Sequence, residues 1–164
     1  MLLTSPAAQL SATILFTLLL AFFFAKVEVH IEGPHGWAAN LPTWRVENHF
    51  LLDLFWGGRA MTGYHAWVFS CIALFFHLPL VFSGDWSWHG EARVLASLML
   101  FWVAEDFLWF VINPAAGWRR FNRQFATWHK HWWWVAPADY WIFLAVAAVL
   151  YRWWLHGAGA VVRC

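Results

Sequence analysis

Glu105 and Asp106 are adjacent carboxylic acids inside an apolar stretch, residues 94–112. Acidic side chains at the depth of a bilayer are costly, and they usually face the interior of a helix bundle and mark a functional site. Two neighbouring carboxyls can serve as general acid and general base, because they resist ionising together. With imidazoles they can also bind a transition metal. The pair therefore predicts where chemistry takes place.

Histidines near one membrane face are the expected partners of this pair. His65 begins the second apolar stretch, His35 lies in the connection before it, and His129 lies in the connection after the third stretch. Imidazoles and carboxylates together suit iron, manganese or zinc. The predicted metal ligands are His35, His65, His129, Glu105 and Asp106. The predicted catalytic residues are Glu105, Asp106 and His65.

Three functions are compatible with such a site. The first is a metal-dependent enzyme acting on a lipid-like or other hydrophobic substrate. The second is a metal-free isomerase or transferase, in which Glu105 and Asp106 act as acid and base. The third is a non-catalytic membrane subunit, or a pigment-binding or haem-binding protein, with His65 or His77 as the ligand of the cofactor.

The composition indicates the solvent of the protein. Of the 164 residues, 62% are hydrophobic and only 12% are charged. A soluble domain carries about 25% charged residues, because water must wet its surface. The length predicts one domain, residues 1–164, with membrane lipids around it. The net charge of +1 gives no basic field that would attract nucleic acid.

Four apolar stretches predict an all-α integral membrane protein with four transmembrane helices, residues 10–25, 64–82, 94–112 and 140–154. A bilayer requires about 20 helical residues, so the first and last stretches depend on interfacial residues at their ends. The Asn113-Pro114 pair predicts the end of the third helix. The first stretch lacks a basic leading segment, so we expect it to be a retained span and not a cleaved signal.

The connections are predicted to contain two amphipathic helices lying in the membrane interface, at 47–56 and 118–132. Aromatic residues recur in the second at spacings of three and four, at positions 118, 121, 125, 128 and 132. This spacing forms one stripe of a helix with cations on the opposite face. On that helix His129 borders the stripe and His131 points sideways, so we expect His129 to face inward.

The basic residues predict the orientation in a plasma or inner membrane. Lys and Arg are enriched after the first and third spans, at Lys26, Arg45, Arg59, Arg119, Arg120, Arg123 and Lys130. Cytoplasmic loops carry such an excess, which places both termini outside the cytoplasm. Both long connections then cover the same membrane face. We therefore expect the acids and imidazoles to share one site there.

Overall fold

Local sequence signals set the ends of the long helices. The computed structural model describes residues 5–55 and 58–161. Helix α1 (Pro6–Glu32) begins where Ser5 accepts a hydrogen bond from the Ala8 amide, and it ends before Gly33. Helix α3 (Gly63–Ser83) is capped by Thr62, and α4 (Trp88–Ile112) is capped by Ser87. Side-chain oxygens at these positions accept from otherwise unpaired amides of the first turn.

Short elements occupy the connections. Helix α2 spans Phe50–Phe55, and a 3-10 turn, η1, spans Trp118–Arg120. Strand β1 (Arg45–Val46) pairs antiparallel with β2 (Met61–Thr62), and β3 (Trp132–Trp133) pairs antiparallel with β4 (Ala136–Pro137). Helix α5 (Ala138–Val161) follows β4 directly. Each hairpin therefore leads the chain into a long helix.

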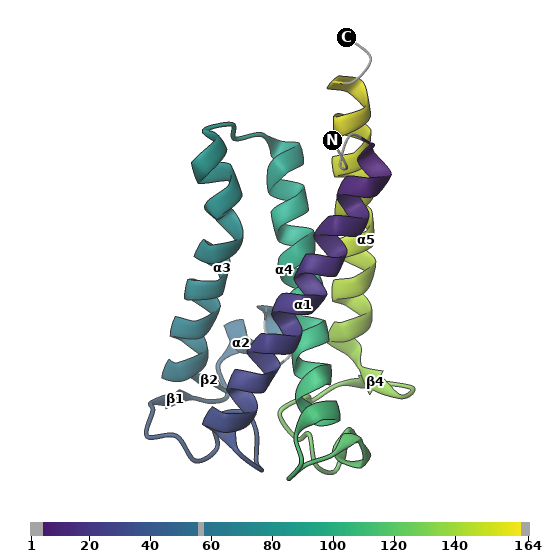
Figure 1. Ribbon diagram of the computed structural model, residues 1–164. Helices are drawn as coiled ribbons and strands as arrows, with labels where there is room; N and C mark the ends of the chain where they lie inside the picture. The colour runs from purple at the N-terminus through teal and green to yellow at the C-terminus, as the bar shows by residue number, and fades with distance from the viewer. Residues whose placement is uncertain (1–4, 56–57, 162–164) are drawn as a thin grey trace.

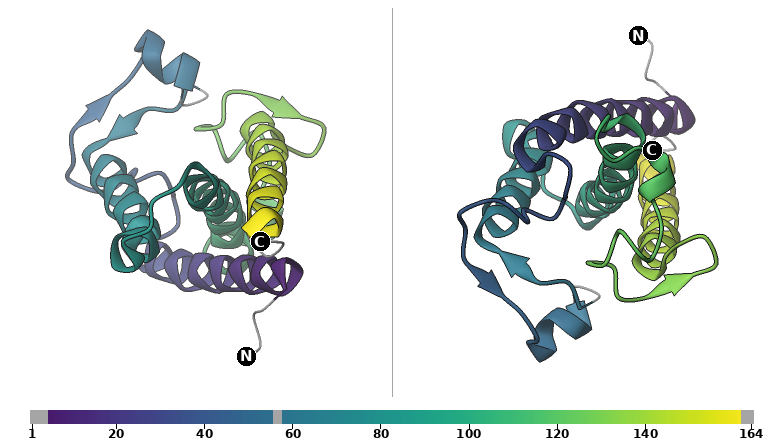
Figure 2. Two further views of the ribbon diagram at one scale, coloured as in Figure 1. Left: turned by 90° about the horizontal axis from the view of Figure 1, so that it is seen from above. Right: turned by 90° about the horizontal axis from the view of Figure 1, so that it is seen from below.

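Helix α4 is the centre of the arrangement, with α1, α3 and α5 around it (Figures 1 and 2). Small side chains are fully or almost fully buried where α4 meets its neighbours, at Ala21 on α1 and at Ala92 and Ala96 on α4. Such residues let helix backbones approach closely, which is the usual packing in membranes. The tight packing fixes the position of the acidic pair on α4.

Within residues 5–55 and 58–161, three helices are long and apolar enough to cross a membrane: Pro6–Glu32, Gly63–Ser83 and Trp88–Ile112. The protein is therefore mostly helical and suited to a membrane. The predicted fourth span corresponds to α5, which packs along α4, but its status as a span stays a prediction. The first helix extends beyond the expected 10–25 at both ends, so Glu28 and Glu32 are helical.

The prediction of a helix at 118–132 is wrong. Only Trp118–Arg120 forms a 3-10 turn, and turns follow it. The Asn122 carboxamide oxygen accepts from the amides of Gln124 and Phe125, which competes with helical bonding. The aromatic side chains Phe121, Phe125, Trp128 and Trp132 instead pack inward against Trp109 and Phe110. Their spacing serves a buried cluster, not a helix face.

The prediction of a helix at 47–56 is correct in part. Helix α2 covers only Phe50–Phe55, and residue 56 lies outside the described residues. Phe50 and Leu51 are 70% and 44% exposed, as an apolar face toward lipid requires. Six residues make less than two turns, so the helix is shorter than the predicted 47–56.

Both connections gather at one end of the molecule, opposite the two chain termini (Figure 1). Lys130 Nζ lies 3.3 Å from Asp53 Oδ1, which joins the connection before α3 to the one before α5. Arg59 and His129 join the same two connections more deeply, with 2.5 Å between their nearest nitrogens. Polar side chains far apart in the sequence therefore meet at one end of the molecule, and the position of this end at a membrane face stays a prediction.

Candidate active site

A cavity of about 650 Å³ lies against α4 at the end where the connections gather. Its polar part is lined by Glu28, Glu32, Arg59, His65, Glu105, Asp106, His129 and Asp139. Its apolar part is lined by Phe69, Leu95, Leu98, Met99, Trp102, Ile142 and Phe143. Leu95 precedes Glu105 by ten helical residues, or about 15 Å along the axis. The cavity is therefore elongated, with acids at one end and hydrocarbon at the other.

Asp106 is bound by two neighbouring side chains through one of its carboxylate oxygens. Its Oδ2 atom accepts hydrogen bonds from the Tyr140 hydroxyl and from His129 Nε2, the latter at 3.0 Å. Tyr140 lies on α5 and His129 on the preceding connection, so the carboxylate ties three parts of the chain together. A carboxylate used in this way positions its partners, and it has little freedom to react itself.

His129 is buried and contacts polar groups through both ring nitrogens. Its Nδ1 atom lies 2.5 Å from Arg59 Nη2 and 3.5 Å from Asp139 Oδ1. Because the guanidinium can only donate, Nδ1 accepts and Nε2 carries the proton that is donated to Asp106. Arg59 also donates to Asp139, so one guanidinium contacts both the imidazole and a second carboxylate. His131 is exposed, so the expected inward position of His129 agrees with the structure.

Glu105 has a different environment from its neighbour. Its side chain is buried in the cavity wall, with the residue 4% exposed. Within residues 5–55 and 58–161, its Oε1 atom has no hydrogen-bond partner. Trp109 and Trp128 also line the cavity, and among the described residues their indole nitrogens likewise have no hydrogen-bond partner. Buried polar atoms are nearly always paired, so these three are available to a bound molecule.

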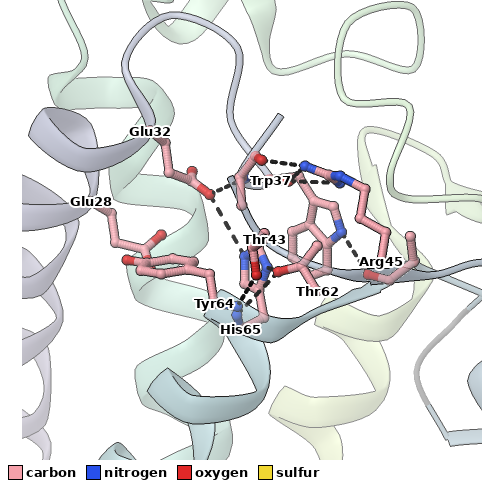
Figure 3. A network of polar contacts seen from close by, with 10 residues as sticks. Glu28, Glu32, Trp37, Thr43, Arg45, Thr62, Tyr64 and His65 are labelled. Atoms are coloured by element: carbon pink, nitrogen blue, oxygen red, sulfur yellow. Dashed lines mark hydrogen bonds and ion pairs between the residues drawn. The ribbon is translucent and has the colours of Figure 1, made fainter. Parts of the chain in front are cut away.

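Two further acids approach the cavity from α1 (Figure 3). Glu28 Oε1 accepts from the Tyr64 hydroxyl at 2.9 Å. Glu32 Oε1 accepts from the Ala38 amide at 2.5 Å and lies 3.7 Å from His65 Nε2. Both acids are 6% exposed. Spacing of four residues places them on one face of the helix, which turns toward the cavity.

His65 is held by its surroundings at three points. Its Nδ1 lies 2.7 Å from Thr62 Oγ1, its backbone amide donates to the same oxygen, and Trp37 stacks on the ring with 4.0 Å between centroids. Trp37 is fixed in turn, because its indole N–H donates to the Ala60 carbonyl at 2.9 Å. The predicted catalytic residue His65 is thus oriented toward Glu32 (Figure 3).

The predicted metal site of iron, manganese or zinc is not assembled as expected. His35 is exposed and lines a separate pocket, away from the other four proposed ligands. Across the described parts of the chain, no group of three or more His, Cys, Asp or Glu side chains has the arrangement to hold a metal ion. The reason is that Asp106 and His129 already bond to each other, to Tyr140 and to Arg59.

Of the two proposed cofactor ligands, His77 is occupied at both ring nitrogens. Its Nδ1 lies 2.6 Å from the Ala73 carbonyl, and its Nε2 lies 2.9 Å from Glu91 Oε1. His65 contacts Thr62 through Nδ1, and its Nε2 lies 3.7 Å from Glu32 Oε1. A haem or chlorophyll ligand needs a free imidazole nitrogen, so the geometry gives no support to His77 in that role.

Four residues of the site were not predicted from the sequence: Glu28, Trp37, Asp139 and Tyr140. Glu28 and Glu32 follow the apolar stretch at a spacing of four, and this is a helical signal that could have extended the first helix. Asp139 and Tyr140 follow Pro137 and Ala138, in the first turn of α5. The helix dipole favours acidic residues there, so the position of Asp139 at a helix start was predictable. Its role in the site was not.

Gly36 lets the first connection lie against the tryptophans of the cavity. Its φ is +68°, and an added Cβ would meet Trp128 Cη2 at 2.9 Å and Trp109 Cη2 at 3.3 Å. We expect Gly36→Ala to lower the free energy of unfolding by about 2–3 kcal/mol through backbone strain and crowding. Gly84→Ala is the control, because Gly84 has φ +67° with nothing within 4 Å.

Thermal unfolding in a nonionic detergent measures both variants. Gly84→Ala should lose only the backbone contribution, about 1 kcal/mol. An equal loss in the two variants would show that the contact of Gly36 with Trp128 does not matter.

Comparison of the chain with protein family models, with curated proteins and with solved structures gives no match.

Proposed function

We propose that the protein is a membrane-embedded isomerase that moves a carbon–carbon double bond in a hydrophobic substrate by proton transfer. Four helices span a plasma or inner membrane in this proposal, and both long connections face the cytoplasm. The apolar part of the cavity receives the hydrocarbon from the bilayer. The acidic part carries out the chemistry, and no metal is needed.

The observation that carries this proposal is the state of Glu105. Its carboxyl group is buried in the wall of a cavity, and among the described residues its Oε1 atom has no partner. A buried carboxyl oxygen that no side chain of the protein engages is free to meet a bound molecule, and a carboxylic acid in that position can act as a general acid. Asp106 is bonded to Tyr140 and His129 and supports the site as a positioning residue.

The groups in the cavity favour proton transfer to and from carbon. The Glu105 carboxylic acid gives its proton to one alkene carbon, and the π electrons form the new C–H bond. Positive charge then resides on the adjacent carbon. Loss of a proton from the next carbon to the Glu32 carboxylate forms the shifted double bond. Both carboxyls exchange protons with water afterwards, so no oxidant or reductant is consumed.

His65 supports Glu32 in this cycle. Its Nε2 atom lies 3.7 Å from Glu32 Oε1 and can approach it to share the accepted proton. Thr62 and Trp37 hold the imidazole in place for this role. The function assigned to the predicted catalytic pair is therefore divided: Glu105 donates, Glu32 with His65 accepts, and Asp106 orders the surrounding side chains.

Incubation in D₂O tests the proposal without an assumed substrate. Purified protein is mixed with a total lipid extract in D₂O, the lipids are returned to H₂O, and mass spectrometry identifies molecules that retain deuterium on carbon. We expect one class of unsaturated lipid to gain deuterium with active protein and not with heat-inactivated protein. No such gain in any lipid would refute the isomerase.

Blocking the cavity gives the matched test of where the reaction occurs. Ile142 lines the apolar part of the cavity and is 47% exposed, so a larger side chain fits without disturbing the core. We expect Ile142→Trp to lower deuterium incorporation at least ~10-fold, because it fills space that the substrate needs. Val149 lies two turns further along α5 and is 67% exposed.

Val149→Trp adds the same side chain outside the cavity and should keep full incorporation. Equal incorporation by the two variants would show that the reaction, if present, takes place elsewhere.

A further inference from the structure

The acids of the cavity are not balanced by basic residues. Arg59 donates to Asp139, and Lys130 pairs with Asp53 at 3.3 Å. In the described part of the protein, no Lys or Arg nitrogen lies within 4.0 Å of a carboxylate oxygen of Glu28, Glu32 or Glu105. Three buried acids therefore face one cavity without a cation of the protein beside them.

Arg45 does not fill this role, although it lies nearby. Its guanidinium donates to the backbone carbonyls of Trp37 and Ala38, and it does not line the cavity (Figure 3). An anionic headgroup such as a phosphate or a fatty acid finds no cation to pair with beside these acids, and burying an unpaired anion is costly. The charge distribution therefore selects against anionic lipids.

Tryptophan rings complete the wall around these acids. Trp102 and Trp109 lie three and four residues from Glu105 and Asp106 on α4, and Trp128 packs edge-to-face on Trp109 with 6.3 Å between centroids. All three line the cavity. The faces of indole rings attract a cation, most strongly where water is excluded. The acids, which have no basic partners, favour a cationic ligand. The indole rings favour a cation as well.

We propose that the cavity binds a hydrophobic molecule with a single positive charge on nitrogen, a long-chain tertiary or quaternary ammonium. The carboxyl groups of Glu28, Glu32 and Glu105 surround the charge, and the apolar part of the cavity holds the chain. This inference rests on the proposed function, because the cation formed when Glu105 protonates a double bond has its charge at the same place. The ammonium compound is thus a mimic of that intermediate and an inhibitor of the reaction.

Three probes of equal chain length test the preference for charge: N,N-dimethylhexadecylamine, 1-hexadecanol and hexadecanoate. Their binding to the purified protein is measured in one nonionic detergent and expressed per mole of micellar detergent, which makes the hydrophobic contribution equal. We expect the amine to bind at least ~10-fold more tightly than the alcohol, and hexadecanoate to bind most weakly.

Neutral isosteres identify the residues responsible. Glu105→Gln and Glu28→Gln should each lower the affinity for the amine about 10-fold and leave that for the alcohol within about twofold. Two independent variants keep the test valid if one does not fold. Asp85→Asn is the matched control, since Asp85 is exposed in the connection between α3 and α4 at the other end of the molecule.

The outcomes separate this inference from the isomerase proposal. Equal binding of the amine and the alcohol, tighter binding of hexadecanoate, or unchanged amine affinity in both Gln variants would overturn the cation site. Selective amine binding without deuterium incorporation in D₂O would retain the cation site and overturn the isomerase. Deuterium incorporation that the amine does not inhibit would retain the isomerase and overturn the cation site.

Discussion

Glu105→Gln should lower deuterium incorporation into the lipid substrate by at least ~100-fold, because general acid catalysis contributes about 10²–10⁴ to a rate. Glutamine has nearly the shape of the protonated acid but cannot deliver a proton to carbon. The change removes no hydrogen bond of Oε1, which has no partner among the described residues. The midpoint of thermal unfolding should therefore stay close to that of the wild type.

Two comparisons make this prediction specific. Glu47→Gln removes an exposed acid outside the cavity and should retain full incorporation. Glu105→Asp retains the acid but withdraws it by one methylene group, and an intermediate rate is expected because proton transfer depends on distance. Wild-type incorporation by Glu105→Gln, with the protein folded, would exclude this residue as the proton donor.

Asp106→Ala, unlike Glu105→Gln, should mainly affect stability. We expect a loss of about 3–5 kcal/mol in the free energy of unfolding. The substitution leaves the Tyr140 hydroxyl and His129 Nε2 without their common acceptor inside the protein. His129 would no longer be held beside Arg59 and Asp139, and α5 would lose a polar link to α4. Unfolding in mixed micelles of a nonionic detergent and dodecyl sulfate measures this loss.

Asp106→Asn is the companion variant for this measurement. Its carboxamide oxygen can still accept a hydrogen bond, so about half of the loss is expected. The neighbouring substitution Glu105→Gln should leave stability unchanged. If Asp106→Ala and Glu105→Gln destabilise the protein equally, the division of the acidic pair into a positioning residue and a proton donor is wrong.

The apolar helices were predictable because their composition is set by lipid. Hydropathy alone located the three helices that, among the described residues, are long and apolar enough to cross a membrane, and Asn113-Pro114 correctly predicted the end of α4. The gathering of acids and imidazoles at one face also followed from sequence, since antiparallel spans bring alternate connections together. The burial of Glu105 and His129 agrees with that expectation.

The connections were less predictable, for physical reasons. Aromatic residues spaced three and four positions apart are compatible with a helix face. In this chain they belong to a folded-back loop that packs on Trp109 and Phe110. Tertiary packing overrides such a period when polar side chains such as Asn122 bond to the local backbone. The role of Glu28 depended on a helix that continues past the apolar stretch, where hydropathy gives no signal.

The long-range bonds of Arg59 have a consequence for folding. Its guanidinium meets His129 and Asp139, which are 70 and 80 positions later in the chain. These partners come together only when both connections lie at the same end of the helix bundle, as in Figure 1. Contacts between residues so far apart in the chain form late in folding, because α3 and α4 must be in place before Arg59 can meet His129 and Asp139.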